Sequence, residues 1–200
     1  LKSGNDACVA IAENVAPDEE DFVWRMNLKA QLLGCVSTTF QNTNGLPDDQ
    51  HKSCAYDLAV IARYALQNDT FSQIVQTRYA TIHWVGQRQC QVKNTNRLLQ
   101  FYPGAIGVKT GTTNAAGQCL IAAAKRGDHC LIAVVLKSQN RFLDAANLLD
   151  YGFKTIGCNR GNRLTAIGFL RDMGYTEIRL TLNIQEDIYE YIKLPHYRAG

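Results

Sequence analysis

Two apolar runs joined by a short polar turn constrain the fold of this chain most strongly. The stretch QCLIAAAKRGDHCLIAVVLK, residues 118–137, holds the turn KRGDH between the two runs and predicts a β-hairpin. AIGVKTGTT, residues 105–113, predicts a strand just before it. RYATIHWVGQRQCQV, residues 78–92, alternates enough to predict a strand pair, and part of TEIRLTLNI, residues 176–184, predicts one more strand.

Helical spacing of apolar residues dominates the regions on either side of these strands. It predicts helices over residues 5–15, 17–34, 53–69 and 140–157, and a short helical turn over 70–77. The candidate N-caps are Asn5 or Asp6, Asp18, and Ser53. In the last helix, one side is expected to carry Leu143, Ala146, Leu149 and Phe153. Helices, then strands, then a helix predict an α+β fold with an antiparallel sheet flanked by helices.

The length of the chain and a change in its composition suggest one domain with the start of another. The chain has 200 residues, which suits one domain or one plus part of a second. After Gly157 the sequence changes to CNRGNRL, a plausible boundary. We therefore expect one domain over residues 1–157 and a separate segment over 158–200.

Charge and hydropathy exclude two classes of partner. The net charge is +3 and no basic stripe or aromatic-interleaved cluster is present, which argues against nucleic acid. No run of about 18 apolar residues occurs, so no segment of this sequence is expected to span a membrane.

The cysteines and histidines do not form a metal-binding pattern. Seven cysteines are present, an odd number without a C-x-x-C pair, and the four histidines are scattered. We expect no metal and no cofactor. With the hairpin turn centred near Gly127, Cys130 lies opposite Ala123 and Cys119 opposite Val134. The two thiols are then about 13 Å apart, beyond disulfide reach.

Lys109, Thr110 and Gly111 form the first candidate for chemistry. A glycine inside a strand often marks a place where another chain or a ligand approaches the backbone closely. A phosphate-binding loop is excluded, because that motif needs glycine directly before the lysine and a helix after it, whereas Val108 precedes Lys109. The alternative is a solvated lysine on a surface strand.

The triplet Ser3-Gly4-Asn5 indicates a chemical role for Lys109. Ser/Lys acyl-transfer enzymes use S-x-x-K, then S-x-N, then K-T-G along the chain. The last two elements occur here in that order, one before a predicted helix and one in a predicted strand. The alternative for Ser3 and Asn5 is simple helix capping.

Longer segments extend this match to a known family. SGNDACVAIAE, DFVWRMNLKAQLLG, YDLAVIARYAL, NTNRLL, GVKTGTTNAAGQCLIAAAKR and RFLDAANLLDYGF resemble the low-molecular-weight penicillin-binding proteins, the serine-type D-alanyl-D-alanine carboxypeptidases. The resemblance covers roughly residues 1–156 and implies a penicillin-binding/β-lactamase-like transpeptidase fold. Residues 158–200 resemble faintly the β-rich second domain of these enzymes.

The resemblance implies an activity, a location and partners. The expected reaction removes the terminal D-Ala of peptidoglycan stem peptides through a serine acyl-enzyme. The expected partners are a stem peptide ending in D-Ala-D-Ala and β-lactam antibiotics, and the expected location is extracytoplasmic, in the cell envelope of a bacterium.

The resemblance also implies roles for single residues. Ser3 relays a proton to the leaving D-Ala, Asn5 holds the substrate amide, and Lys109 completes the catalytic group. The substrate-binding residues are expected to be Thr110, Gly111, Thr112 and Arg141. The Thr112 N–H is expected to be an oxyanion donor.

Two arginine positions leave an alternative open. Arg141 matches a family arginine near the carboxylate pocket, but it also suits a surface position at a helix start. Arg97 is a second candidate, although some relatives carry that arginine two positions earlier, where this chain has Thr95.

One departure from the family bears directly on activity. The acylated serine and its lysine base lie in S-x-x-K, and none of the Ser-x-x-x windows of this chain has lysine at the fourth position. We therefore expect an N-terminally truncated peptidase domain that is inactive alone. We also expect the truncation to expose the apolar faces of the hairpin and one edge of the sheet, and so to favour association.

Two other functions remain open from the sequence. A class A β-lactamase uses the same three elements but adds a glutamate for deacylation, and no matching glutamate is found here. A non-catalytic peptidoglycan-binding module would keep the groove without the nucleophile.

Overall fold

The computed structural model describes residues 1–83, 89–158 and 179–182, with side chains described up to Ile156. Its helices are α1 (Asn5–Val15), α2 (Glu19–Leu32), α3 (Ala55–Leu66), α4 (Asp69–Gln76), α5 (Leu98–Phe101) and α6 (Arg141–Cys158). Its strands are β1 (Tyr79–His83), β2 (Gln89–Lys93), β3 (Ala105–Thr113), β4 (Gly117–Arg126), β5 (His129–Ser138) and β6 (Arg179–Leu182).

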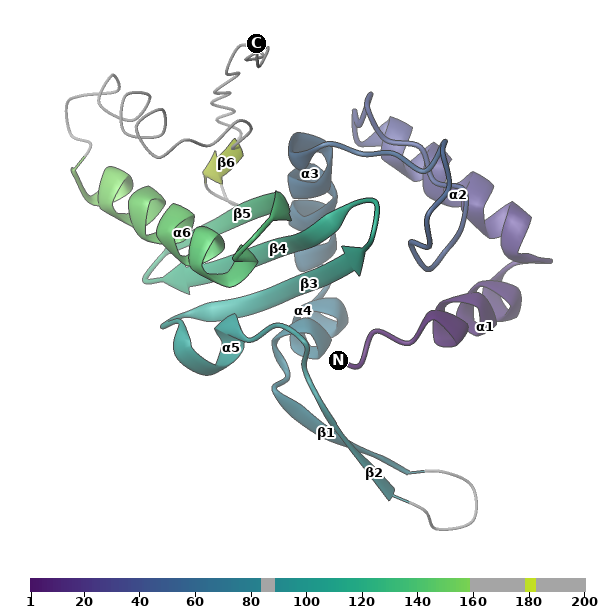
Figure 1. Cartoon of the computed structure of the whole chain (residues 1–200), viewed down its shortest axis with the longest axis horizontal. Coiled ribbons are helices and arrows are strands. Elements are labelled where there is room, and N and C mark those ends of the chain that lie inside the picture. Colours follow the sequence, from purple (N-terminus) through teal and green to yellow (C-terminus); the bar gives the residue numbers. More distant parts are fainter. Residues whose placement is uncertain (84–88, 159–178, 183–200) are drawn as a thin grey trace.

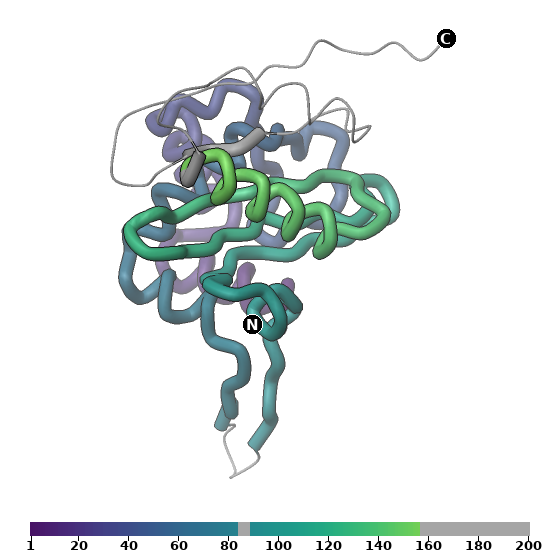
Figure 2. The backbone as a smooth tube through the Cα atoms, turned by 90° about the vertical axis from the view of Figure 1, so that its left-hand side faces the viewer, coloured from purple at the N-terminus to yellow at the C-terminus, as the bar shows by residue number. Residues whose placement is uncertain are grey.

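The main sheet is antiparallel, with the strand order β3-β4-β5-β6 (Figure 1). In Figure 2, α6 lies on one side of this sheet and the N-terminal helices lie on the other. The β1–β2 hairpin pairs separately and extends away from the sheet. The predicted α+β class with an antiparallel sheet between helices is confirmed. The turn of that hairpin and most of the segment 158–200 lie outside the described residues.

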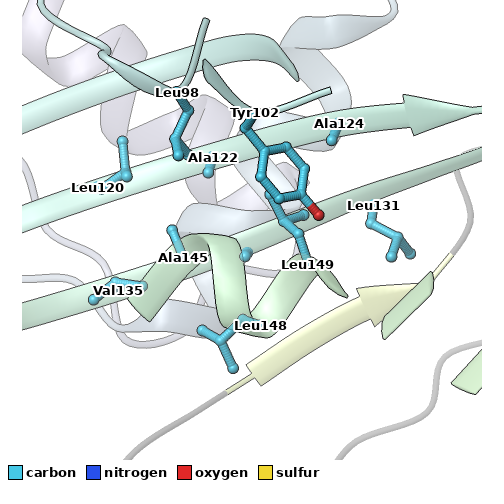
Figure 3. Close-up of a cluster of buried hydrophobic side chains, with 11 residues drawn as sticks. Leu98, Tyr102, Leu120, Ala122, Ala124, Leu131, Val135, Ala145, Leu148 and Leu149 are labelled. Atoms are coloured by element: carbon cyan, nitrogen blue, oxygen red, sulfur yellow. The ribbon is translucent and has the colours of Figure 1, made fainter. Parts of the chain in front are cut away.

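The face of the sheet under α6 holds the larger apolar core (Figure 3). Alternate side chains of β4 and β5 meet the buried face of α6, as the period-2 and 3.6-residue patterns require. The buried members of this cluster are Leu98, Tyr102, Leu120, Ala122, Ala124, Leu131, Ala133, Val135, Ala145, Leu148 and Leu149. The Tyr102 hydroxyl donates to Asp150 Oδ1 at 2.7 Å, so the polar tip of this side chain is satisfied.

The opposite face of the sheet packs against α3. Small residues on α3, namely Ala55, Ala59 and Ala62, allow this helix to approach Ala123, Ile132 and Val134 closely. Both faces of the β4–β5 hairpin are therefore covered, and β6 pairs with β5 along Leu131–Val134. The expectation that the apolar faces and this edge would be exposed was wrong, because helices on both sides and β6 provide the missing partners.

Three local predictions also need correction. The N-cap of α1 is Gly4, because Asn5 is already helical, and the N-cap of α3 is Cys54 rather than Ser53. The predicted cap Asp18 is confirmed, since its Oδ1 accepts from the Asp21 N–H at 2.8 Å. On α6, Leu143 is 53% exposed, because it lies two residues, or about 200°, from the buried Ala145.

The hairpin register differs from the expected one by two residues. Arg126 pairs with His129, so the turn consists of Gly127 and Asp128, and Cys130 pairs with Lys125 rather than Ala123. Val134 therefore pairs with Ile121 rather than with Cys119, and the register shifts between Gln118 and Leu120, so Cys119 has no partner on β5. Both cysteines are free thiols, as expected.

Gly104 fixes the entry of the chain into β3. Its φ is +82°, and a Cβ there would lie 2.3 Å from the Lys125 carbonyl oxygen. Gly45 has a similar φ of +84°, but a Cβ at that position would meet no atom of the described residues within 4 Å. Gly45 therefore provides a matched control.

We expect Gly104→Ala to destabilise the fold more than Gly45→Ala. The left-handed backbone alone costs roughly 1–2 kcal/mol for alanine. The clash at Gly104 adds about 1–3 kcal/mol, as for other overpacked sites. Urea unfolding of both variants measures the difference, and equal midpoints would contradict this account of the β3 entry.

Candidate active site

The two sequence motifs meet at Lys109 and Ser3. Lys109 lies in the middle of β3, and its Nζ donates to Ser3 Oγ at 2.8 Å and to the Thr110 carbonyl oxygen. The start of the chain lies beside β3, where the Thr95 N–H donates to the Leu1 carbonyl oxygen at 3.3 Å (Figure 1). Residues 106 positions apart in sequence therefore share one contact.

The Ser3 backbone is held in an unusual conformation. Its φ is +61°, in the left-handed region that a residue with a side chain rarely adopts. Such conformations cost on the order of 1–3 kcal/mol and cluster at functional sites. The helix-capping alternative fails for Ser3 and Asn5, because Gly4 is the N-cap of α1 and no side-chain cap hydrogen bond is present in this described helix.

The other side chain of this motif, Asn5, is exposed to solvent. It lies in the first turn of α1, and its side-chain amide makes no hydrogen bond within the part of the chain that the structure describes. A ligand would therefore not have to displace a protein partner from this side-chain amide.

The surroundings of Lys109 favour loss of its proton. Partial burial lowers the pKa of the ammonium below the usual lysine value, because a charged group loses water there. The Cys8 thiol, one turn into α1, acts in the opposite direction when ionised, and the positive charge of Arg141 lowers the Lys109 pKa further.

We expect the Lys109 ammonium to titrate below the value of 10.5 that is usual for lysine. Because Arg141 contributes to the lowering, Arg141→Gln should raise the Lys109 pKa. Following the Lys109 Cε chemical shift against pH in both proteins measures this. A midpoint that stays unchanged on removal of the arginine would show that the two charges do not interact.

Thr110 and Gly111 are neighbours on β3, but the first is buried and the second is exposed. Thr110 is only 6% exposed, and its Oγ1 lies 2.7 Å from Thr95 Oγ1. Gly111 is exposed, and a Cβ there would meet only Cys119 Cβ among the described residues, at an ordinary 4.0 Å. Packing within the described residues therefore does not require glycine at 111.

Arg141 ties the start of α6 to the same strand. Its Nη1 donates to the Gly111 carbonyl oxygen at 2.8 Å, to Thr112 Oγ1 at 2.7 Å and to the Cys119 carbonyl oxygen at 3.3 Å. Its Nε is buried and has no partner within the described residues. Arg141 is therefore not a free surface arginine but a cation held beside Gly111 and Thr112.

The second arginine candidate, Arg97, contacts the start of α6. Its guanidinium stacks over the Phe142 ring, 5.6 Å from the centroid, and Arg141 lies 5.1 Å from the same ring. The structure thus brings together Ser3, Lys109, Thr110, Gly111, Thr112 and Arg141, and Asn5 follows Ser3 by two residues at the start of α1.

Sequence reasoning named Thr95 only as the position where some relatives carry an arginine, and it missed both the contact of Thr95 with Thr110 and Cys8 as a neighbour of Lys109. Cys8 follows Gly4 by one helical turn, a spacing that could have placed it on the Ser3 side of α1. No sequence signal pairs Thr95 with Thr110, because their contact depends on how the loop before α5 lies against β3.

The described residues hold no group of three or more histidine, cysteine or acidic side chains placed to bind a metal ion. Among the described helices, none combines the length and the apolar character needed to cross a bilayer.

Comparison with known proteins identifies relatives of this chain. A family model described as D-alanyl-D-alanine carboxypeptidase matches residues 1–140. D-alanyl-D-alanine carboxypeptidase DacF of Bacillus subtilis is 40% identical over 156 residues, which cover 76% of this chain and 40% of that protein. DacD of Salmonella typhimurium is 33% identical over 210 residues, which cover all of this chain and 52% of that protein.

Solved structures agree with these relatives. The D-alanyl-D-alanine carboxypeptidase of Mycobacterium tuberculosis H37Rv aligns with a TM-score of 0.71 and 36% identity, over 76% of this chain and 60% of that chain. The DD-transpeptidase of Streptomyces K15 aligns with a TM-score of 0.65 and 37% identity, over 68% of this chain and 55% of that chain. The chain thus spans about half the length of these relatives. The matched length and the shared fold place it in the D-alanyl-D-alanine carboxypeptidase family.

Proposed function

We propose that the protein removes the terminal D-Ala from peptidoglycan stem peptides through a serine acyl-enzyme, and that β-lactams acylate the same serine. The observation that carries the proposal is the 2.8 Å contact between Lys109 Nζ and Ser3 Oγ, next to an open glycine-bearing strand. Family membership supports this reaction class. The location that follows is extracytoplasmic, in a bacterial cell envelope.

The Lys109–Ser3 contact suits proton delivery to the leaving group. An ammonium only donates hydrogen bonds, so Ser3 Oγ must accept from Lys109, and the serine proton stays free for another acceptor. In the proposed reaction that acceptor is the amine of the departing D-Ala. The lowered pKa of Lys109 helps it to replace the proton that Ser3 gives away.

The remaining groups bind and orient the peptide in this proposal. The peptide backbone lies along β3 beside Gly111, in the manner of an added strand. Its carboxylate lies near the Thr110 hydroxyl and the cations Lys109 and Arg141. Asn5 holds the peptide amide, and the Thr112 N–H is one oxyanion donor.

The acylated serine is proposed to come from a segment outside these 200 residues, because no S-x-x-K occurs among them. We further propose that residues 1–157 belong to the peptidase domain and that 158–200 begin a β-rich second domain. Support for the latter is the match to DacD, which extends over the whole chain.

Release of D-Ala from a stem pentapeptide by the protein that carries S-x-x-K tests the proposal. We expect release by the parent and a loss of about 10²–10⁴-fold in Ser3→Ala, the range for a general acid–base group. Ser53→Ala is the control, because it removes an exposed hydroxyl bonded to Thr38 instead of Lys109. Peptide binding without release would favour the binding module, and rapid penicillin turnover would favour a β-lactamase.

A further inference from the structure

Thr95 connects two parts of the site that no sequence motif joins. Its Oγ1 lies 2.7 Å from Thr110 Oγ1, and its N–H donates to the Leu1 carbonyl oxygen, two residues before Ser3. One residue therefore contacts both the strand that carries Lys109 and the segment that carries Ser3.

The loop around Thr95 is held by buried amides on either side. Asn94 is 6% exposed, and its Nδ2 donates to the carbonyl oxygens of Val75 at 3.1 Å and Thr77 at 2.9 Å. Asn96 is 1% exposed, and its Oδ1 accepts from the Leu98 N–H at 3.1 Å. Thr95 itself is exposed between them, so its backbone is fixed while its hydroxyl faces the site.

The proton count of the two hydroxyls limits how they work together. Each threonine hydroxyl has one proton to donate and two lone pairs that accept. If Thr110 donated to Thr95, it would have no proton left for a ligand. If Thr95 donates to Thr110, the Thr110 proton is free, and the shared hydrogen bond makes Thr110 a stronger donor.

We propose that Thr95 is a positioning residue: its hydroxyl donates to Thr110 Oγ1 and so directs the Thr110 proton toward the carboxylate of the substrate. Its N–H also holds the segment that leads to Ser3, at a fixed distance from β3. The identity of the ligand group, the substrate carboxylate, rests on the proposed function. The hydrogen bond between the Thr95 and Thr110 hydroxyls does not depend on that function.

The first test is independent of catalysis and uses the chain as it is. Three-bond couplings to the Thr110 methyl carbon report its χ1 angle. We expect the Thr110 side chain to occupy one rotamer in the parent. In Thr95→Val, which removes the hydroxyl at nearly constant volume, it should average over several rotamers. In Thr95→Ser, which keeps a hydroxyl, it should again occupy a single rotamer. A Thr110 rotamer that remains fixed in Thr95→Val overturns the proposal.

The second test separates carboxylate recognition from general damage. The protein that carries S-x-x-K is compared on a peptide ending in D-Ala-D-Ala and on the same peptide with a C-terminal amide. Thr95→Val should lower kcat/KM about tenfold on the acid, the size of one charge-assisted hydrogen bond, and much less on the amide. Thr95→Ser should restore the acid rate.

Thr81→Val is the matched control, because Thr81 is an exposed threonine on the separate β1–β2 hairpin. Equal losses on acid and amide would overturn the directing role and leave a structural one. If the parent released no D-Ala from either peptide, the proposed function would fail, while the Thr110 rotamer would still decide the role of Thr95.

Discussion

A polypeptide of these 200 residues should not be covalently labelled by a fluorescent penicillin. Labelling requires a serine whose hydroxyl is activated by a nearby base. The chain has five serines, and none lies in S-x-x-K. Ser3, the serine that contacts Lys109, accepts a hydrogen bond from the charged ammonium and is therefore not activated as a nucleophile.

The labelling experiment needs both a positive and a negative control. A longer form of the protein that contains S-x-x-K should be labelled, and replacing the serine of that element by alanine should abolish the label. A stable band from the 200-residue chain on a denaturing gel would contradict the assignment of the nucleophile to another segment.

Replacing Lys109 should have the second largest effect. In the protein that carries S-x-x-K, we expect Lys109→Ala to slow β-lactam acylation by at least about 100-fold, as for loss of a positioned acid–base group. The variant loses both the contact to Ser3 and a cation beside the proposed carboxylate position. Stopped-flow acylation with a fluorescent penicillin measures the rate.

The same variant should fold almost normally. Lys109 keeps an exposed surface and makes no ion pair within the described residues, so the stability should change by about 0.5 kcal/mol or less, as at other surface sites. Lys125→Ala, an exposed lysine on the neighbouring β4, serves as the control. If Lys109→Ala were acylated at a rate within threefold of the parent rate, Lys109 would be only a solvated lysine on a surface strand.

Local patterns were sufficient to predict most of the secondary structure and the motif residues. The β4–β5 hairpin, the strand around Lys109 and the helix that begins at Arg141 all follow from residue spacing and turn residues. The order of Ser3 and Lys109 in the chain pointed to one site because the motif itself requires them to meet.

Features that depend on tertiary packing escaped prediction. The alanines of α3 carry no sequence signal for the strand face they cover, so the expectation that truncation would leave this face exposed was wrong. The pairing of Cys130 with Lys125 depends on a two-residue turn that a count from Gly127 misplaces. The contact of Thr95 with Thr110 depends on the buried Asn94 and Asn96, whose hydrogen bonds are visible only in the folded chain.

The most direct test of the account is a double-mutant cycle between Ser3 and Lys109 on the rate of D-Ala release. If the two side chains act as one proton-delivery unit, the double variant should be about as slow as the slower single variant, because residues that act together are strongly non-additive. Losses that multiply in the double variant would contradict the account, since they would show that Ser3 and Lys109 act independently despite their 2.8 Å contact.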